Sequence, residues 1–132
     1  MRLENLGLIG NCQCSALIDR TGSLVWCCMP RFDSEPVFGR LLDEAGGEFS
    51  IRPAGGGQGT QRYLDNSNIL ETVFETGGGK FRVLDFAPRF QQHERMFRPT
   101  QIVRIVEPLE GTPSIHVRCE PRLRISPDRL LF

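Results

Sequence analysis

The segment from Asn11 to Met29 constrains the fold most strongly, because two runs of apolar and β-branched residues flank a tight-turn sequence there. The turn sequence is Asp19-Arg20-Thr21-Gly22-Ser23, and its central Gly is typical of a β-hairpin. This pattern predicts antiparallel strands over about 8–19 and 23–29. A chain that begins with such a hairpin has to bury an apolar sheet face against a second layer.

Further short strands follow at regular spacing, separated by turns rich in Gly and Pro. We expect them over 47–53, 61–64, 68–75, 80–86, 100–107 and 114–120. Segment 37–42 has the i, i+4 apolar spacing of a short helix, and 88–99 is predicted to be an exposed excursion. The fold class is therefore all-β, an antiparallel β-sandwich with at most one short helix near 37–42. We expect one domain over 1–132.

Composition excludes several classes of partner. The chain has 16 basic and 16 acidic residues, so no net charge attracts it to nucleic acid or to an anionic membrane. No apolar stretch is long enough to span a bilayer, and the N-terminus lacks the apolar core of a signal peptide. Five cysteines, an odd number, favour a reducing compartment, so we expect a cytoplasmic location.

The cysteines of the first hairpin raise the question of a metal site. Cys12, Cys14, Cys27 and Cys28 offer four thiols, but zinc sites normally use Cys-x-x-Cys pairs. The predicted register places Cys27 opposite Ala16, with Cys12, Cys14 and Cys27 on one apolar face and Cys28 on the other. We favour core packing of these thiols, and we predict no metal and no cofactor.

The best polar candidates lie in the loop that follows the first hairpin. Arg31, Phe32 and Asp33 either form a turn closed by an Arg–Asp pair or reach a substrate bound nearby. The other carboxylate of interest is Asp85, which ends an apolar strand and is predicted to form an Asx-type turn. Neither position offers a second carboxyl group or a nucleophile beside it, so no catalytic residue is assigned.

An ordered series of motifs covers nearly the whole chain: Leu8-Ile9-Gly10-Asn11-Cys12, Gly22-Ser23-Leu24-Val25-Trp26, Pro30-Arg31-Phe32-Asp33-Ser34, Arg62-Tyr63 and Val83-Leu84-Asp85-Phe86-Ala87-Pro88. This series resembles the N-terminal (trehalase-like) domain of family 15 glycoside hydrolases, the bacterial glucoamylase and trehalase type. Asn11 stands where these proteins commonly have Asp.

The resemblance implies a β-supersandwich followed by an α/α barrel. In that family the barrel carries both catalytic Glu residues of an inverting mechanism on α-glucosidic bonds. The resemblance therefore implies an incomplete structural and docking domain that is inactive alone. Its partners would be the missing helical barrel or a second copy bound through exposed sheet, and its ligand an α-glucoside or trehalose. The alternative is a free-standing carbohydrate-binding module.

Overall fold

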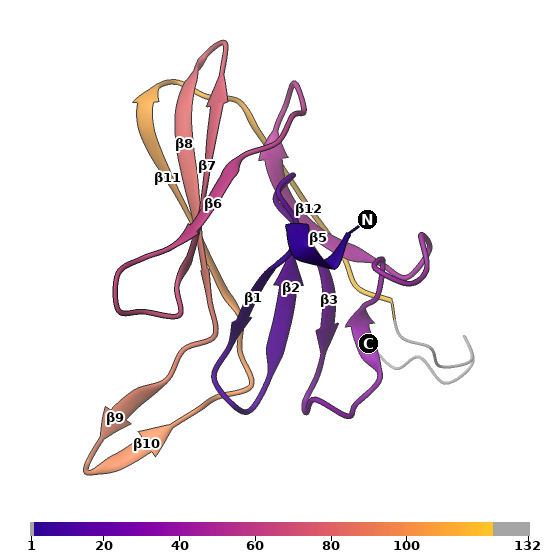
Figure 1. Cartoon of the computed structure of the whole chain (residues 1–132), viewed down its shortest axis with the longest axis vertical. Helices are drawn as coiled ribbons and strands as arrows, with labels where there is room; N and C mark the ends of the chain where they lie inside the picture. The colour runs from indigo at the N-terminus through magenta and orange to yellow at the C-terminus, as the bar shows by residue number, and fades with distance from the viewer. Residues whose placement is uncertain (1, 123–132) are drawn as a thin grey trace.

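The computed structural model describes residues 2–122, which form two antiparallel sheets and a projecting hairpin (Figure 1). A short 3₁₀ turn over Leu3–Asn5 precedes the first sheet. That sheet has the strand order β1-β2-β3-β5-β12, and β4 pairs with β3 outside this path. Its strands are β1 (Gly7–Gly10), β2 (Ser15–Ile18), β3 (Ser23–Cys28), β4 (Pro36–Phe38), β5 (Glu48–Pro53) and β12 (Ile115–Glu120).

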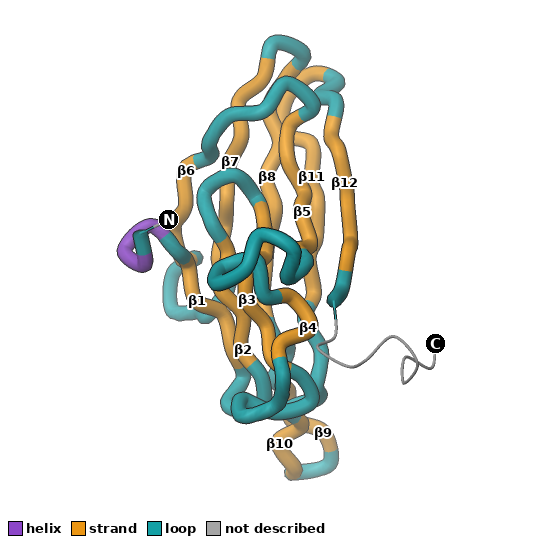
Figure 2. The backbone as a smooth tube through the Cα atoms, turned by 90° about the vertical axis from the view of Figure 1, so that its right-hand side faces the viewer, coloured by secondary structure: helices purple, strands orange, loops and turns teal. Residues whose placement is uncertain are grey.

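The second sheet has the strand order β11-β8-β7-β6, and the projecting hairpin is formed by β9 and β10. Strands of both sheets run along the long axis of the molecule (Figure 2). The all-β, antiparallel prediction is thus confirmed. The strands are β6 (Thr60–Tyr63), β7 (Leu70–Thr76), β8 (Gly79–Phe86), β9 (Phe90–Gln92), β10 (Arg95–Phe97) and β11 (Val103–Gly111).

The β2–β3 turn forms because its side chains satisfy its own backbone. Asp19 Oδ1 accepts hydrogen bonds from the backbone N–H groups of Thr21 at 2.9 Å and Ser23 at 3.0 Å. Gly22 has a φ of +89°, and a Cβ at this position would collide with the carbonyl oxygen of Ile51. Only Gly fits here, because the turn needs a left-handed residue in close contact with β5.

The core consists of two apolar clusters. The first lies mainly within the first sheet and the second lies between the sheets, and Phe49 packs against both. Phe74 of β7 and Phe81 of β8 stack with their ring centroids 5.0 Å apart, and both are almost fully buried. The first cluster consists of Ile9, Ala16, Ile18, Leu24, Cys27, Phe38 and Leu70; the second of Ile51, Phe74, Phe81 and Val83.

Two local predictions were wrong. Segment 8–19 is two strands, because residues 11–14 form a turn in which Cys12 has a φ of 71°. Cys12 is therefore exposed and does not share the buried face of Cys14 and Cys27. Segment 37–42 is not a helix, because Phe38 pairs with Cys27 and buries its ring in the first cluster. Among residues 2–122, no helix is long and apolar enough to cross a membrane.

Removal of the Phe81 ring tests the core between the sheets. Phe81→Ala deletes a fully buried ring that stacks on Phe74, so we expect a loss of about 3–5 kcal/mol in the free energy of unfolding. Urea denaturation followed by circular dichroism measures this loss. Leu42→Ala, at a side chain that is 75% exposed, is the control and should change stability by less than about 0.5 kcal/mol. Equal effects of the two substitutions would contradict the assigned core.

Candidate functional site

Four loops meet at one end of the sandwich, which we call the loop end. It comprises residues 11–14, 29–35, 64–69 and 87–101. Asn11 is its central contact: Nδ2 donates to the carbonyl oxygens of Pro88 at 2.9 Å and Pro99 at 2.8 Å, and Oδ1 accepts from the backbone N–H groups of Gln13 and Cys14. A buried Asp could not donate both bonds. Asn at this position therefore holds the β1–β2 turn against the 87–101 segment.

The predicted candidates Arg31, Phe32 and Asp33 lie at the loop end and are exposed. Arg31 Nε lies 3.3 Å from Asp33 Oδ1, with 69% and 75% of the two side chains exposed, so this pair contributes little to stability. Thr100 Oγ1 donates to the carbonyl oxygen of Pro30 at 3.4 Å and joins this loop to the 87–101 segment. The Arg–Asp turn of the first alternative exists, and the Phe32 ring remains available for contact.

Phe32 lines an open groove of about 650 Å³ between the 29–35 and 64–69 loops. The exposed Tyr63 ring is a second wall of this groove, and its hydroxyl is fixed by the backbone of Leu8. Tyr63 Oη accepts from Leu8 N–H at 3.0 Å and donates to Leu8 O at 2.7 Å. Two exposed aromatic rings, one of them fixed, suit contact with a flat apolar face. The remaining lining residues are Leu8, Ile9, Gly10, Cys12, Ser15, Ser67 and Asn68.

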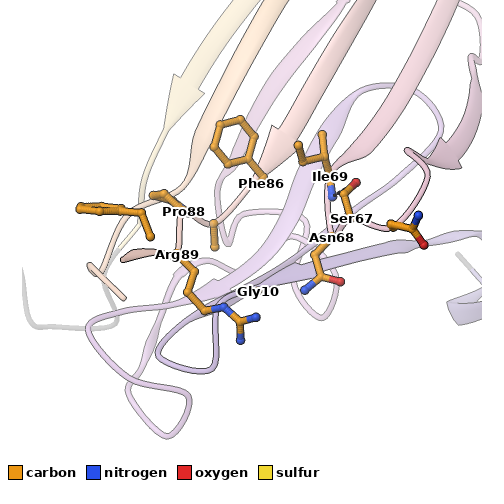
Figure 3. Close-up of a pocket in the computed structure, with 10 residues that line it drawn as sticks. Gly10, Ser67, Asn68, Ile69, Phe86, Pro88 and Arg89 are labelled. Carbon is orange, nitrogen blue, oxygen red and sulfur yellow. Dashed lines mark hydrogen bonds between the residues drawn. The ribbon is translucent and has the colours of Figure 1, made fainter. Parts of the chain in front are cut away.

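A second open groove, of about 640 Å³ (Figure 3), adjoins the first, since Gly10, Ser67 and Asn68 line both. Arg89 enters it from the base of the β9–β10 hairpin, and Asn68 enters it from the 64–69 loop. Ile69 and Phe86 supply apolar surface. This groove therefore combines a guanidinium, an amide and apolar contact area, which favours binding of a partner over catalysis.

Glu71, a buried carboxylate of β7, serves the fold. Its oxygens accept from Arg62 Nε at 2.7 Å and from Arg82 Nη1 at 2.9 Å. Burial raises the pKa of Glu71, but the hydrogen bonds from the two arginines outweigh this effect and leave the pKa below its ordinary value. Glu71 is thus ionised at neutral pH and unsuited to the role of a general acid.

Glu48 of β5 has a similar environment. It accepts hydrogen bonds from Ser23 Oγ, from Arg40 Nη1 at 2.6 Å and from Arg52 Nη2 at 3.1 Å. Burial raises the pKa of Glu48, and the bonds from Ser23 and Arg40 lower it further than burial raises it. The carboxylate joins β5 to the β2–β3 turn and to the segment after β4, and it too remains ionised at neutral pH.

Asp85 of β8 forms no Asx turn, so that prediction was wrong. It lies inside the strand, fully buried, and pairs with Arg104 of β11, whose Nε lies 2.6 Å from Oδ1. Burial raises the pKa of Asp85, and the adjacent guanidinium opposes the rise. The alternation of β8 could have indicated an inward-facing Asp85. Its partner, 19 residues away, requires knowledge of the β8–β11 register.

Of the three thiols predicted to pack on one apolar face, Cys14 and Cys27 are buried and Cys12 is exposed, while Cys28 is buried as well. Burial and the neighbouring thiols of Cys14 and Cys28 raise the pKa of Cys27 to about 12, so it is not a reactive thiolate at neutral pH. Within residues 2–122, no three His, Cys, Asp or Glu side chains are placed to hold a metal ion.

The Asp85–Arg104 pair can be tested by removal of one or both partners. Arg104→Met leaves a buried carboxylate without its partner, so we expect a loss of about 3–5 kcal/mol in the free energy of unfolding. Asp85→Leu combined with Arg104→Met should recover much of this loss in urea denaturation. Arg118→Met, which removes an exposed pair, is the control. A single substitution no more harmful than this control would refute the assigned role.

The lowered pKa of Glu71 predicts a pH dependence of stability. Its ionised form favours folding, so this stabilisation is fully present above the ordinary Glu pKa of 4.5 and disappears as the pH falls through the lower pKa of the folded state. Glu71→Gln should therefore destabilise the chain at pH 7, and the difference from the wild type should shrink towards pH 3. Urea midpoints at both pH values measure this. The exposed Glu75→Gln is the control, and a constant difference for Glu71→Gln would contradict the prediction.

Comparison with known proteins identifies a protein family and several relatives whose sequences match this chain. A family model described as "Trehalase-like, N-terminal" matches residues 1–128. Trehalase 1 of Sulfolobus acidocaldarius is 48% identical over 87 residues, which are 65% of this chain and 15% of that protein. The trehalase of Mycolicibacterium smegmatis is 33% identical over 133 residues, covering 90% of this chain and 20% of that protein.

A third relative, the trehalase of Thermoplasma volcanium, is 29% identical over 135 residues, covering 97% of this chain and 21% of that protein. The chain thus spans about a fifth or less of the length of these curated relatives. No solved structure matches it significantly. Since the family model covers almost every residue, the chain belongs to the trehalase-like N-terminal domain family.

Proposed function

We propose that this chain is the N-terminal structural and docking domain of a trehalase-type glycoside hydrolase. One observation carries the proposal: the chain matches the N-terminal family model over 1–128, and this segment is only 15–21% of the three trehalases compared. The half-buried carboxylate Glu48 and the buried carboxylates Glu71 and Asp85 are all held by arginines. Bond cleavage is therefore assigned to a portion of the parent enzyme outside this domain, and the parent is an inverting hydrolase of α-glucosidic bonds.

The open edges of the two sheets support the docking role. β11 and β12 each end a sheet, and apolar side chains on them are exposed: Ile105, Val106, Leu109 and Val117. Edge strands with apolar side chains favour pairing with further strands. In the parent enzyme this side would meet the rest of the sandwich and the helical barrel. In the isolated chain it would favour self-association.

The loop end supports a second part of the proposal, namely that Arg31, Phe32 and Asp33 lie near the substrate of the parent enzyme. Loops that project from a rigid sandwich often contribute to a neighbouring site. The exposed Phe32 ring and the fixed Tyr63 ring offer stacking surface for trehalose or another α-glucoside. The relatives named above are all trehalases, which favours trehalose over a glucoamylase substrate and gives no support to a free-standing carbohydrate-binding module.

The five free cysteines support a reducing location for the parent enzyme, which we place in the cytoplasm.

A chimera tests this function. The 132-residue chain alone is expected to release no glucose from trehalose, whereas Mycolicibacterium smegmatis trehalase that carries this chain in place of its own matching segment is expected to hydrolyse trehalose. In the chimera, Phe32→Ala should raise the KM for trehalose about 10-fold through loss of a stacking contact. Leu3→Ala, at an exposed side chain outside the loop end, is the control. Turnover by the isolated chain, or a folded chimera without activity, would overturn the proposal.

A further inference from the structure

The β9–β10 hairpin projects from the loop end, and no other segment of residues 2–122 is packed along it (Figures 1 and 2). We call residues 88–99 the arm. Every residue of its two strands is exposed. Phe90 and Phe97 face each other across the strands, with rings stacked 5.5 Å apart, and remain 47% and 42% exposed, while Met96 is 56% exposed. Apart from their contact with each other, these apolar side chains are largely exposed to solvent in the described part of the chain.

The arm lacks the features that would keep it folded by itself. A single two-stranded hairpin is marginally stable in water, because it has no second layer on which to bury a face. Its turn is also unfavourable, because His93 and Glu94 have φ values of 50° and 63°. Two-residue turns of this kind favour Asn-Gly, since residues with larger side chains adopt the left-handed conformation at a cost. The arm therefore needs an external contact to be held as a hairpin.

The base of the arm is, in contrast, firmly attached. The carbonyl oxygens of Pro88 and Pro99, one on each side, accept from the buried Asn11 amide at 2.9 and 2.8 Å. Thr100 bonds to the carbonyl oxygen of Pro30 beside the candidate loop 31–33. The direction of the arm relative to the sandwich is therefore fixed even where its tip is weak. A hairpin whose tip is marginally stable and whose base is firmly attached is suited to insertion into a partner protein.

The charge of the arm indicates which kind of partner fits. Arg89, Arg95 and Arg98 are opposed by a single acid, Glu94. Within the described part of the chain, none of these three guanidinium groups forms an ion pair, whereas those of the sheets, such as Arg82 and Arg104, are paired with carboxylates. Arg89 and apolar Phe86 also both line the groove at the arm's base (Figure 3). Unpaired guanidinium groups around stacked phenyl rings match an apolar cleft bordered by carboxylates.

We propose that the arm docks into an apolar cleft, bordered by carboxylates, on the hydrolase portion of the parent enzyme. This inference rests on the proposed function. Glycoside hydrolysis uses two carboxyl groups, so the hydrolase portion is acidic around its active site, and an arm with a net positive charge is attracted to a cleft beside that site. Pairing of the arm with the arm of a second copy is disfavoured, because two arms of like charge repel each other.

The first test uses the 132-residue chain alone and measures amide hydrogen exchange. Amides of residues 90–97 should exchange within about tenfold of the rate of an unstructured peptide, while those of β7 and β8 should be strongly protected. The double variant His93→Asn, Glu94→Gly supplies the preferred turn and should slow exchange in the arm alone. Protection of the wild-type arm equal to that of β7 and β8 would overturn the inference, because such an arm needs no partner.

The second test uses the chimera described above. Exchange of residues 90–97 should slow by at least about tenfold relative to the isolated chain. Phe90→Ser with Phe97→Ser, and separately Arg89→Gln with Arg95→Gln and Arg98→Gln, should abolish this protection. Leu3→Ser and Arg20→Gln, at exposed positions outside the arm, are the matched controls and should preserve it. A chimera that hydrolyses trehalose with an unprotected arm overturns the docking inference and leaves the proposed function intact. A protected arm in a folded but inactive chimera supports the docking and counts against the function.

Discussion

The guanidinium of Arg104 joins the two sheets at the centre of the sandwich, and the arrangement of the strands around it depends on its hydrogen bonds. From β11 it reaches Asp85 on β8, the carbonyl oxygen of Phe49 on β5 at 2.6 Å and that of Gly22 at 2.9 Å. It also lies 5.0 Å from the centroid of the Phe49 ring. Lys could not replace it, because an ammonium lacks the planar fork that serves these acceptors together. One buried side chain thus holds the β2–β3 turn and β5 in place against the second sheet.

Polar side chains connect the segments that apolar packing alone would leave free to slide. Asn11 attaches the first turn to the arm's base, and Glu48 attaches the first hairpin to the segment after β4. Both bind several groups at once, and neither belongs to an apolar cluster. The loop end is consequently positioned by the hydrogen bonds of Asn11, while the sheets combine apolar packing with buried polar contacts such as those of Arg104. A surface for partner contact on a rigid body needs loops that are positioned without being buried.

Local patterns predicted those features that neighbouring residues determine. The predicted pairing of Ala16 with Cys27 is confirmed, but the register nearer the turn was wrong: Ile18 pairs with Leu24, and a register shift lies between Leu17 and Ile18. The predicted helix at 37–42 was wrong for two reasons. β4 forms backbone hydrogen bonds with β3, and Phe38 packs in the first apolar cluster, and local apolar spacing reveals neither contact. The role of Asp85 was missed for the same reason, since its partner is distant in sequence. The candidate residues 31–33 were correctly placed in a loop, but the grooves beside them arise from four segments that meet only in the fold.

The Tyr63 hydroxyl occupies both the N–H and the carbonyl group of Leu8 on the edge strand β1. At Leu8, β1 therefore offers a further strand neither a free N–H nor a free carbonyl group, and the phenol of Tyr63 occupies the position where that strand would pair. On the far side of the sandwich β11 and β12 have no such guard among residues 2–122. The Tyr63 hydroxyl thus protects the β1 edge of the first sheet against an added strand, whereas the β11 and β12 edges remain open to one.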